Sequence, residues 1–470
     1  MGSTERRYDL TIIGSGPGGY VAAVRAGQLG LSTALVEKAP RPGGTCLHWG
    51  CIPTKALLHA AEVLETATRA ATFGIQVDGV RLDLPAVHDY KNKVVQANAK
   101  GVEFLLGKNK VDLLRGHARL AGPGRVEVTP PEGGAPFTLE TRHVVLATGS
   151  VVRGLPGVEF DGVRILGSDE ALGLATVPRS MIVLGAGAVG VEFASIWRSF
   201  GTEVTLVELL PRLVPLEDAD LGAELEKAFR RRGIRSHTST RVTGVTVDGE
   251  GVRVQAERGG EPLALAADLL LVAVGRRPFL DDLGLEHTRV GLDARGFVEV
   301  DAMNRTAEPG VYAIGDLLPT PALAHVASHE GILAVEHAAG HDPVPIDYDR
   351  IPSCTYCLPE VASIGLTEEA ARQRGHDVVA ARFPFTAIGK AKILDDTRGF
   401  VKIVSGRPHD EVLGVHIIGP HATELIAEAS AALSLEATTE SIFRVIHAHP
   451  TLSEAMGEAA LAVHGRAIHA

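Results

Sequence analysis

The sequence predicts a protein of the α/β class, in which two similar α/β domains are followed by a smaller α+β domain. Three observations support this prediction. Apolar strand patterns alternate with helical patterns along most of the chain, as in parallel sheets that are covered by helices. One unit of strand, glycine-rich turn, helix and strand occurs twice. A chain of 470 residues also exceeds the size of one hydrophobic core, and its length suggests about three domains.

The first copy of the repeated unit lies close to the start of the chain. An apolar strand over 10–13 runs into the sequence Gly14-Ser-Gly16-Pro-Gly-Gly19, and a helical pattern follows to about Leu29. A second strand over 32–36 then ends on Glu37. The acidic residue stands 23 positions after the first glycine.

The second copy repeats this order with the same spacing. A strand over 181–184 runs into Gly185-Ala-Gly187-Ala-Val-Gly190, and a helix is predicted through Phe200. A strand over 203–207 then ends on Glu208, again 23 positions after the first glycine.

This pattern has a physical explanation in dinucleotide binding. The first glycine makes a tight turn, the second lets the backbone approach a pyrophosphate, and the third lets the helix pack on the sheet. The acidic side chain accepts a hydrogen bond from the adenosine ribose. A lone glycine pattern is weak evidence, but both copies have the expected strand, helix and acid. We therefore predict two Rossmann-like dinucleotide-binding domains, and Glu208 favours NAD over NADP because its charge would repel a 2′-phosphate.

Three more strands are predicted to end beside these sites. The segments 143–150 and 269–275 end in small residues that would let the backbone approach a ligand. The segment 310–316 ends on Asp316, which is predicted to be exposed; an ordinary aspartate turn is the alternative. The stretch 122–136, rich in Gly and Pro, is predicted to be a loop within a β-rich insert.

Past about Pro343 the pattern changes to short strands mixed with helices. Strands are predicted over 362–366, 399–404 and 412–418, and helices over 368–374, 422–435 and 439–446. This mixture predicts the α+β domain.

Composition excludes several classes of partner. The formal net charge of −11 argues against nucleic acid and against an anionic membrane surface. No apolar run reaches the length of a spanning helix. The residues before the first strand contain no apolar segment typical of a secretory signal. We expect a cytoplasmic protein, or a mitochondrial matrix protein whose transit peptide has been removed.

The chain has four cysteines, and two of them form the strongest chemical signal. Cys46 and Cys51 stand in the stretch 43–55, directly after the first dinucleotide unit and at the start of a predicted helix. A bridge between them would close a short loop and add little stability. The helix N-terminus and Lys55 would favour a thiolate, so at least one of the two is expected to ionise readily. The spacing is unusual for zinc, and a redox-active disulfide is the preferred interpretation.

Cys354 and Cys357 have the C-x-x-C spacing that is also found in redox proteins. They lie between Pro352 and Pro359, with no cofactor motif or predicted helix start beside them. We interpret them as small buried apolar side chains rather than as a second redox pair.

Taken together, these motifs resemble those of the dihydrolipoamide dehydrogenases, in the class I pyridine nucleotide-disulfide oxidoreductase family that also contains glutathione reductase. The resemblance rests on the G-G-T-C-x4-C-I-P-x-K stretch, both fingerprints, the Ala-Thr-Gly and Ile-Gly-Asp segments, and the sequence H-A-H-P-T-L-S-E over 447–454. It extends from Tyr8 to about Gly465. Departures from the usual pattern are His48, Thr54 and Ile388, and none of these is a reacting group.

The resemblance implies four domains: an FAD-binding domain over 1–150, an NAD-binding domain over 151–275, a central domain over 276–345 that completes the FAD site, and a dimerisation domain over 346–470. It implies FAD at the first fingerprint, NAD at the second, and no metal. The residues implied at the FAD site are Gly14, Gly16, Gly19, Glu37, Lys38, Gly44, Thr45, Lys55, Ala118, Thr148, Gly149, Ser150, Asp316, Ala324 and His325. Those implied at the NAD site are Gly185, Gly187, Gly190, Glu208 and Gly275. Glu192, on the helix of the second fingerprint, is implied as a partner for Lys55 that tunes the charge of the flavin.

The resemblance also implies a reaction and its partners. His449 of one subunit, oriented by Glu454, would deprotonate dihydrolipoamide beside the other subunit's cysteines. The substrate would attack Cys46, and Cys51 would pass electrons through FAD to NAD. The implied partners are a second copy of the chain and a lipoyl-bearing acyltransferase or glycine-cleavage carrier protein.

Alternatives to this reaction and to these roles stay open at the level of sequence. They include a mercuric reductase, although no vicinal cysteine pair stands near the C-terminus. A glutathione reductase, a soluble transhydrogenase and a docking protein with incidental redox activity are further alternatives. His449 by itself could be a solvated histidine among its neighbours His447, His464 and His469.

Overall fold

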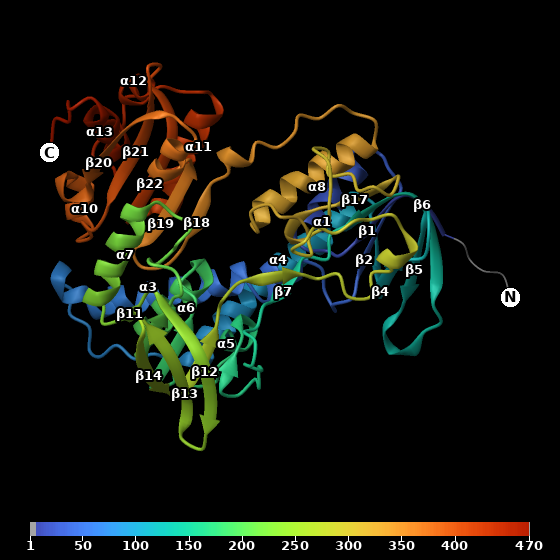
Figure 1. The fold of residues 1–470 in the computed structure, drawn as a ribbon, viewed down its shortest axis with the longest axis horizontal. Coiled ribbons are helices and arrows are strands. Elements are labelled where there is room, and N and C mark those ends of the chain that lie inside the picture. Colours follow the sequence, from blue (N-terminus) through green and yellow to red (C-terminus); the bar gives the residue numbers. More distant parts are fainter. Residues whose placement is uncertain (1–5, 470) are drawn as a thin grey trace. The chain divides into compact units, whose positions relative to one another are not determined.

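The computed structural model describes residues 6–469, which form two compact units (Figure 1). The first unit comprises 6–56, 88–153 and 276–348, and the second comprises 57–87, 154–275 and 349–469. Because each unit is built from three separate segments, neither matches a single continuous stretch of sequence.

The first unit is built on a seven-stranded sheet that carries the first fingerprint. The strand order is β3-β2-β1-β6-β5-β4, with β17 paired to β6. The pairs among β1, β2, β3, β6 and β17 are parallel, whereas β4, β5 and β6 form an antiparallel meander. The strands are β1 Arg6–Ile13, β2 Thr33–Glu37, β3 Asp112–Arg115, β4 His117–Leu120, β5 Arg125–Thr129, β6 Phe137–Leu146 and β17 Val311–Ala313. β7 Ser150–Val152 and β16 Arg276–Pro278 form a separate two-stranded sheet.

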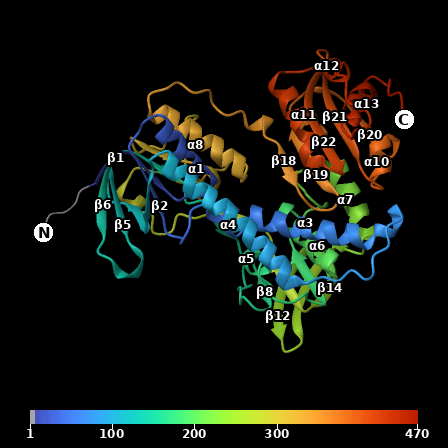
Figure 2. The ribbon, with the colours of Figure 1, turned by 180° about the vertical axis from the view of Figure 1, so that it is seen from behind.

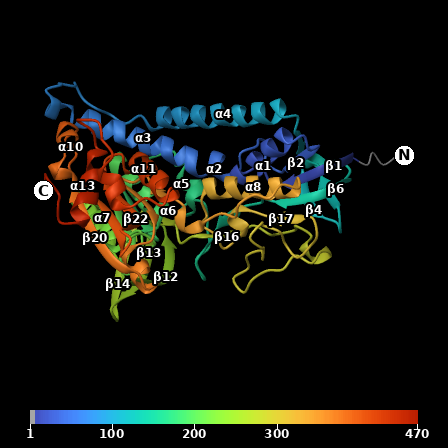
Figure 3. The ribbon, with the colours of Figure 1, turned by 90° about the horizontal axis from the view of Figure 1, so that it is seen from above.

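Helices cover this sheet and hold the fingerprint in place. α1 (Pro17–Gln28) and α8 (Ala324–Ala338) lie side by side (Figure 2). They approach closely because a Cβ on Gly331 would lie only 2.6 Å from the carbonyl oxygen of Gly18. The longest helix, α4 (Leu84–Lys108), is seen along its length in Figure 3. Small residues at the contact between α1 and α8 therefore fix the position of the fingerprint helix.

One local prediction is wrong in this unit. The stretch 122–136, predicted to be a loop, contains strand β5, in which Val126 and Val128 are fully buried. The strand alternates apolar and polar residues but is only five residues long, and the surrounding glycines and prolines concealed it. Pairing with β4 and β6 on both sides stabilises the strand.

The second unit contains the second fingerprint in a five-stranded parallel sheet. The strand order is β11-β10-β9-β15-β8. The strands are β8 Ile165–Leu166, β9 Ser180–Leu184, β10 Glu203–Val207, β11 Arg235–His237 and β15 Leu269–Val272. The helices are α5 Ser168–Ala171, α6 Ala188–Phe200 and α7 Ala219–Arg231, and a meander of β12 Thr240–Asp248, β13 Gly251–Arg258 and β14 Glu261–Ala267 completes this part. The predicted strand over 203–207 and the predicted helix end at Phe200 are confirmed.

The last quarter of the chain forms the predicted α+β structure around an antiparallel sheet of order β18-β19-β22-β21-β20. The three strands and three helices predicted here are present, with ends that differ by a few residues. The strands are β18 Ser353–Thr355, β19 Glu360–Gly365, β20 Asp377–Pro384, β21 Phe400–Arg407 and β22 Glu411–Gly419. The helices are α9 Glu368–Gln373, α10 Gly389–Ile393, α11 Ala422–Ser434, α12 Thr439–Phe443 and α13 Glu454–Val463. No helix within 6–469 combines the length and the apolar character needed to cross a lipid bilayer.

A buried lysine on this antiparallel sheet forms ion pairs with carboxylates at the start of α7. The Nζ atom of Lys402, on β21, lies 2.9 Å from Asp218, 2.8 Å from Asp220 and 2.6 Å from Glu368. Burial raises the pKa of Asp218, but the hydrogen bond and charge of Lys402 more than offset this, so the pKa is lowered overall. The pKa of Glu368 is lowered by the same balance. The lysine therefore stabilises these carboxylates in their charged form.

Replacement of Lys402 by alanine is expected to destabilise the protein by about 3–5 kcal/mol at pH 7, because the buried Asp218 and the half-buried Asp220 and Glu368 lose their cation. Since the folded pKa values of Asp218 and Glu368 are lowered, this contribution is fully present at neutral pH, begins to be lost near the unfolded pKa of about 4, and is gone only below the folded pKa values. Thermal unfolding of wild type and Lys402→Ala at a series of pH values from 7 down to about 3 measures this, because the difference between them should shrink below about pH 4. The control is Lys392→Ala, an exposed lysine on α10. A Lys402→Ala melting temperature equal to that of the control would contradict the expected role.

Candidate active site

The two fingerprints have the same backbone geometry. A Cβ on Gly14 would lie 2.4 Å from the carbonyl oxygen of Ala147, and one on Gly19 would lie 1.9 Å from the carbonyl oxygen of Gly14. A Cβ on Gly16, by contrast, would meet no atom within 4 Å. The first and third glycines are therefore required by packing, whereas the second faces open space, as expected where a ligand approaches the backbone.

The second fingerprint repeats these relations. A Cβ on Gly185 would lie 2.4 Å from the carbonyl oxygen of Ala273, and one on Gly190 would lie 1.9 Å from the carbonyl oxygen of Gly185. Gly187 again faces open space. Neither α1 nor α6 has a side-chain cap or an acidic residue in its first turn, so the N–H groups at both helix starts are available to phosphate oxygens. Both sites fit a bound dinucleotide.

The strand-end acids organise the two glycine-rich loops. The carboxylate of Glu37 accepts hydrogen bonds from the backbone N–H and the hydroxyl of Ser15, and from Ala39 N–H at 2.7 Å. Glu208 accepts from the corresponding backbone groups, Ala186 N–H at 2.6 Å and Leu210 N–H at 2.8 Å. Each acid thus connects the loop after the first glycine to the end of its own strand.

The two glycines that precede the cysteine pair lie directly against the first fingerprint. The N–H of Gly43 donates to the carbonyl oxygen of Ser15 at 3.0 Å. A Cβ on Gly44 would lie 2.6 Å from the Cα of Gly16. Cys46 lies within the short helix α2 (Gly44–His48), and Cys51 is the first residue of α3 (Cys51–Thr68). The predicted helix start at the pair is confirmed.

The four cysteines are thiols in this structure, and Cys46 and Cys51 interact strongly with each other. A hydrogen bond to Cys51, burial and the charge of Cys51 raise the pKa of Cys46, and the positive charge of Lys55 offsets this only in part. Cys46 is therefore not the thiol that ionises readily. One negative charge on Cys51, at the start of α3, suppresses ionisation of its neighbour.

His449 and Glu454 form the hydrogen-bonded pair that the sequence predicts. His449 Nδ1 lies 2.8 Å from Glu454 Oε1, and the N–H of Thr451 donates to Oε2 at 2.9 Å. Burial raises the pKa of Glu454, but these hydrogen bonds and the charge of His449 lower it overall. The histidine side chain is 77% exposed, so Nε2 is the nitrogen that an incoming substrate can reach.

The other histidines near the C-terminus also have carboxylate partners. His447 lies 2.8 Å from Glu428, His464 lies 3.4 Å from Asp410, and His469 lies 2.7 Å from Glu458. A carboxylate partner alone therefore does not distinguish His449. The sequence did not reveal these pairs because their members lie 11 to 54 positions apart.

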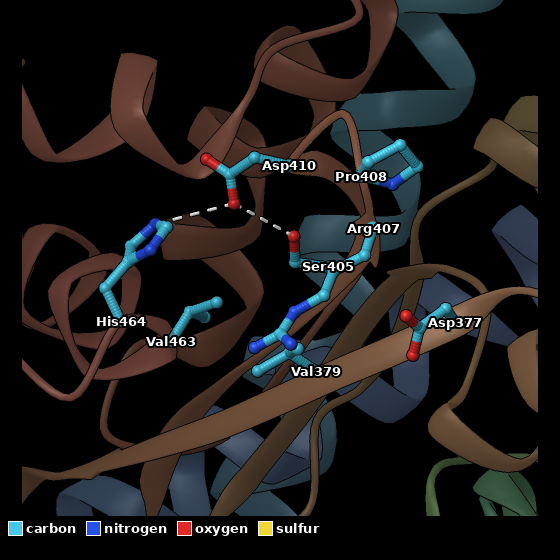
Figure 4. A pocket seen from close by; sticks show the side chains of 8 residues that line it. All are labelled: Asp377, Val379, Ser405, Arg407, Pro408, Asp410, Val463 and His464. Carbon is cyan, nitrogen blue, oxygen red and sulfur yellow. Dashed lines mark hydrogen bonds and ion pairs between the residues drawn. The ribbon is translucent and has the colours of Figure 1, made fainter.

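A cavity of about 590 Å³ lies beside one of these pairs (Figure 4). Asp410 interacts there with Ser405 and His464 and also accepts from Thr439 at 2.7 Å. None of the predicted site residues lines this cavity.

The remaining residues predicted at the FAD site are spread over one edge of the first sheet and its surroundings. Thr148 donates to the carbonyl oxygen of Phe279 at 2.6 Å, and Lys38 Nζ lies 3.8 Å from the centre of the Phe279 ring. Ser150 donates to Asp316, which is half-buried rather than exposed as expected. Gly149 has a φ of +71°, Ala118 is buried on β4, and α8 begins at Ala324 and His325. Thr45 follows Gly44 in α2.

Two further predicted residues are Glu192, expected as a partner for Lys55, and Gly275, expected at the NAD site. Glu192 is 4% exposed on α6 and accepts from Tyr356 N–H at 2.9 Å. Gly275 follows β15, has a φ of +110° and faces open space. The pairing of Glu192 with Lys55 stays a prediction.

Cys354 and Cys357 belong to different hydrophobic clusters. Cys354 is half-buried against the core of the C-terminal sheet, and Cys357 is fully buried in the core around α6. Burial raises the pKa of the Cys357 thiol. This agrees with a packing role, although Cys354 is less buried than expected.

Comparison with known proteins identifies the family. Residues 8–331 match the pyridine nucleotide-disulphide oxidoreductase family, and residues 351–460 match its dimerisation domain. The chain belongs to this family. It is 46% identical to dihydrolipoyl dehydrogenase of Bacillus subtilis, over 98% of this chain and 99% of the relative. It is 42% identical to the mitochondrial dihydrolipoyl dehydrogenase of Pisum sativum, over 98% and 92%.

The fold is also found in a solved structure of the family. LpdA from Mycobacterium tuberculosis superposes with a TM-score of 0.89 at 28% identity, covering 97% of this chain and 99% of that one. The predicted architecture of two dinucleotide-binding domains and a dimerisation domain is confirmed. The protein uses FAD and NAD(H), as its family does, and forms a homodimer through its dimerisation domain.

Replacement of Gly187 and Gly190 by alanine is expected to have different effects. In Gly187→Ala the new Cβ meets no other atom, so the protein is expected to fold normally. The methyl group lies where a pyrophosphate would approach, so NAD+ binding is expected to weaken about tenfold or more. In Gly190→Ala the new Cβ would clash with the carbonyl oxygen of Gly185, so the melting temperature of the protein is expected to fall. Calorimetric NAD+ titration and thermal unfolding separate the two effects. Unchanged NAD+ affinity in Gly187→Ala would contradict this assignment.

Proposed function

We propose that this protein is a dihydrolipoyl dehydrogenase, which oxidises protein-bound dihydrolipoamide to lipoamide and reduces NAD+ through FAD and the Cys46–Cys51 pair. The observation that carries the proposal is the contact between the cysteine segment and the first fingerprint, where Gly43 and Gly44 approach Ser15 and Gly16. This contact supports the proposal, because it brings the segment that carries two interacting thiols next to the first glycine-rich loop. The similarity to dihydrolipoyl dehydrogenases over nearly the whole chain supports this substrate.

The chain's own groups account for the proton and sulfur chemistry. In the oxidised enzyme Cys46 and Cys51 form a disulfide. His449 accepts the proton of one substrate thiol at Nε2, and Glu454 at Nδ1 stabilises the imidazolium. The substrate thiolate attacks Cys46, the Cys46–Cys51 bond breaks, and Cys51 leaves as a thiolate. The second substrate thiol then attacks the substrate sulfur of the mixed disulfide and its proton passes to the departing Cys46, so that lipoamide and the Cys46 thiol are released while His449 keeps the first proton.

The position of Cys51 suits its role as the leaving group. It is the first residue of α3, and the helix N-terminus together with Lys55 stabilises a negative sulfur. The raised pKa of Cys46 agrees with this division, because it favours the protonated thiol at Cys46. FAD, when bound, supplies the two-electron transfer from the dithiol to NAD+.

The related reductases fit less well. Glu208, held by Ala186 and Leu210, occupies the ribose-binding position and opposes a 2′-phosphate, which disfavours a glutathione reductase that uses NADPH. The cysteine pair disfavours a transhydrogenase. A mercuric reductase would need a second cysteine pair near the C-terminus, and the sequence has none there.

The active site requires two subunits in this proposal. His449 and the neighbouring exposed apolar side chains Ile446 and Val445, which are 97% and 52% exposed, lie in the region that matches the dimerisation domain. Such apolar side chains are expected to be covered in the dimer. The lipoyl group would come from an acyltransferase or a glycine-cleavage carrier protein in the cytoplasm or the mitochondrial matrix.

Replacement of Cys51 by serine is expected to abolish lipoamide turnover and the long-wavelength absorbance of a thiolate–flavin charge-transfer complex. The matched variant is Cys46→Ser, which keeps the Cys51 thiolate, so it loses turnover but retains the absorbance. Visible spectra of the purified flavoproteins and NAD+ reduction with dihydrolipoamide measure both properties. Retained turnover in Cys51→Ser, or an absorbance that depends on Cys46 instead, would contradict the assigned roles.

Subunit complementation tests whether His449 acts across the dimer. Cys51→Ser and His449→Gln homodimers are each expected to have little activity. After dissociation and random reassembly, half of the dimers are mixed, and each contains one intact site, so about a quarter of wild-type turnover should return. If His449 served its own chain's cysteines, mixing would restore nothing.

A further inference from the structure

The turn that follows β17 is held by a buried carboxylate. Gly315 has a φ of +68° and starts a short 3-10 helix that contains Asp316. The N–H of Gly315 donates to Glu330 Oε2 at 2.5 Å. The other oxygen, Oε1, accepts from the hydroxyls of Thr320 at 2.9 Å and Tyr348 at 2.8 Å. The side chain of Glu330 therefore connects three separate segments of the first unit.

Glu330 is unusual because it is completely buried without a cation. Its exposed fraction is 0%, and no lysine, arginine or histidine of residues 6–469 forms an ion pair with it. Burial raises the pKa of Glu330, and the hydrogen bonds from Gly315, Tyr348 and Thr320 act in the opposite direction. A carboxylate in this position costs stability unless its donors are well placed, and here three of them converge on it.

The turn held by Glu330 lies at the edge of the sheet where the first dinucleotide is expected. β17 is parallel to β6, with Ala313 opposite Leu146, and β6 is parallel to β1, with Leu146 opposite Ile13. The carboxyl ends of the three strands therefore meet, and ligands of open α/β sheets bind at this edge. Asp316 accepts from Ser150, whose oxygen in turn accepts from Arg276 Nε at 2.7 Å.

The helix of Glu330 is also fixed to the fingerprint helix. Gly331, the next residue on α8, faces Gly18 on α1 so closely that a Cβ would lie 2.6 Å from the Gly18 carbonyl oxygen. A Cβ on Gly18 would in turn lie 2.9 Å from the carbonyl oxygen of Ala327. The helix that holds the Asp316 turn is thus the one against which the fingerprint helix packs.

We propose that Glu330 is a positioning residue for FAD, which holds the Gly315–Asp316 turn at a fixed distance from the first fingerprint and thereby slows release of the flavin. The carboxylate acts through the Gly315 N–H and does not touch the cofactor. This inference rests on the proposed binding of FAD at the first fingerprint, but not on the identity of the dithiol substrate.

The test measures FAD release from purified holoenzyme after dilution into flavin-free buffer, as the flavin-to-protein absorbance ratio after gel filtration at successive times. Glu330→Leu leaves the Gly315 N–H without its acceptor and is expected to release FAD about tenfold faster. Glu330→Gln should stay close to wild type. Its amide oxygen can still accept from Gly315, and the hydroxyls of Thr320 and Tyr348 can turn to accept from its amide nitrogen.

The matched control is Glu308→Leu in the same unit. Glu308 is 5% exposed and accepts from the N–H of Arg289 at 3.0 Å, so its replacement removes another buried acceptor away from the Asp316 turn. A rate of FAD release in Glu330→Leu equal to that of wild type or of Glu308→Leu would overturn the proposal. Equal release from Glu330→Gln and Glu330→Leu would also overturn it, because charge rather than the hydrogen bond would then be responsible.

Two milder variants keep the test decisive if Glu330→Leu does not fold. Thr320→Val and Tyr348→Phe each remove one donor to Oε1 and are expected to accelerate FAD release about two- to threefold. Wild-type release rates in both would overturn the proposal. The assay contains neither lipoamide nor NAD+, so it does not depend on the substrate. If the flavoprotein failed to oxidise dihydrolipoamide, the proposed function would be refuted but the test of Glu330 would remain valid.

Discussion

The close backbone contact between the cysteine segment and the first glycine-rich loop is the constraint on which the proposed chemistry depends. Gly44 approaches Gly16 so closely that a Cβ on Gly44 would lie 2.6 Å from the Gly16 Cα, and the N–H of Gly43 donates to the carbonyl oxygen of Ser15. A redox pair can exchange electrons with a bound cofactor only if it is held beside it. The two helices that start at this contact, α2 and α3, place Cys46 and Cys51 on adjacent elements.

The same fingerprint geometry serves two cofactors. In both copies the first glycine lies against the carbonyl oxygen of the alanine that follows a neighbouring strand, Ala147 or Ala273. In both, the third glycine lies against the carbonyl oxygen of the first glycine. In both, the strand-end acid accepts hydrogen bonds from the backbone of its own loop. The acid therefore has a structural role in addition to ribose recognition, since it holds the loop in the shape that a pyrophosphate requires.

Buried charge is used in two different ways outside the fingerprints. Lys402 on the C-terminal sheet neutralises three carboxylates, two of which lie at the start of α7. Removing one partner of such a buried ion cluster destabilises a protein strongly. Glu330 instead has only neutral donors, which come from the stretch 315–320 that contains the Asp316 turn and from Tyr348. The Lys402 cluster stabilises the second unit. The hydrogen bonds of Glu330 instead fix the geometry of the edge of the sheet where a ligand binds.

The sequence by itself determined the features that depend on neighbouring residues. The two glycine patterns, the cysteine pair beside a helix start, and the His449–Glu454 spacing are all local, so their chemistry could be predicted. Tertiary structure alone decided the features that depend on distant partners. Strand β5 forms because β4 and β6 pair with it, and Glu330 meets Gly315, Thr320 and Tyr348 only after the chain has folded. In the sequence, a buried carboxylate such as this one looks like any other polar residue in a helix. Its burial cannot be predicted there, because its hydrogen-bond donors come from separate segments.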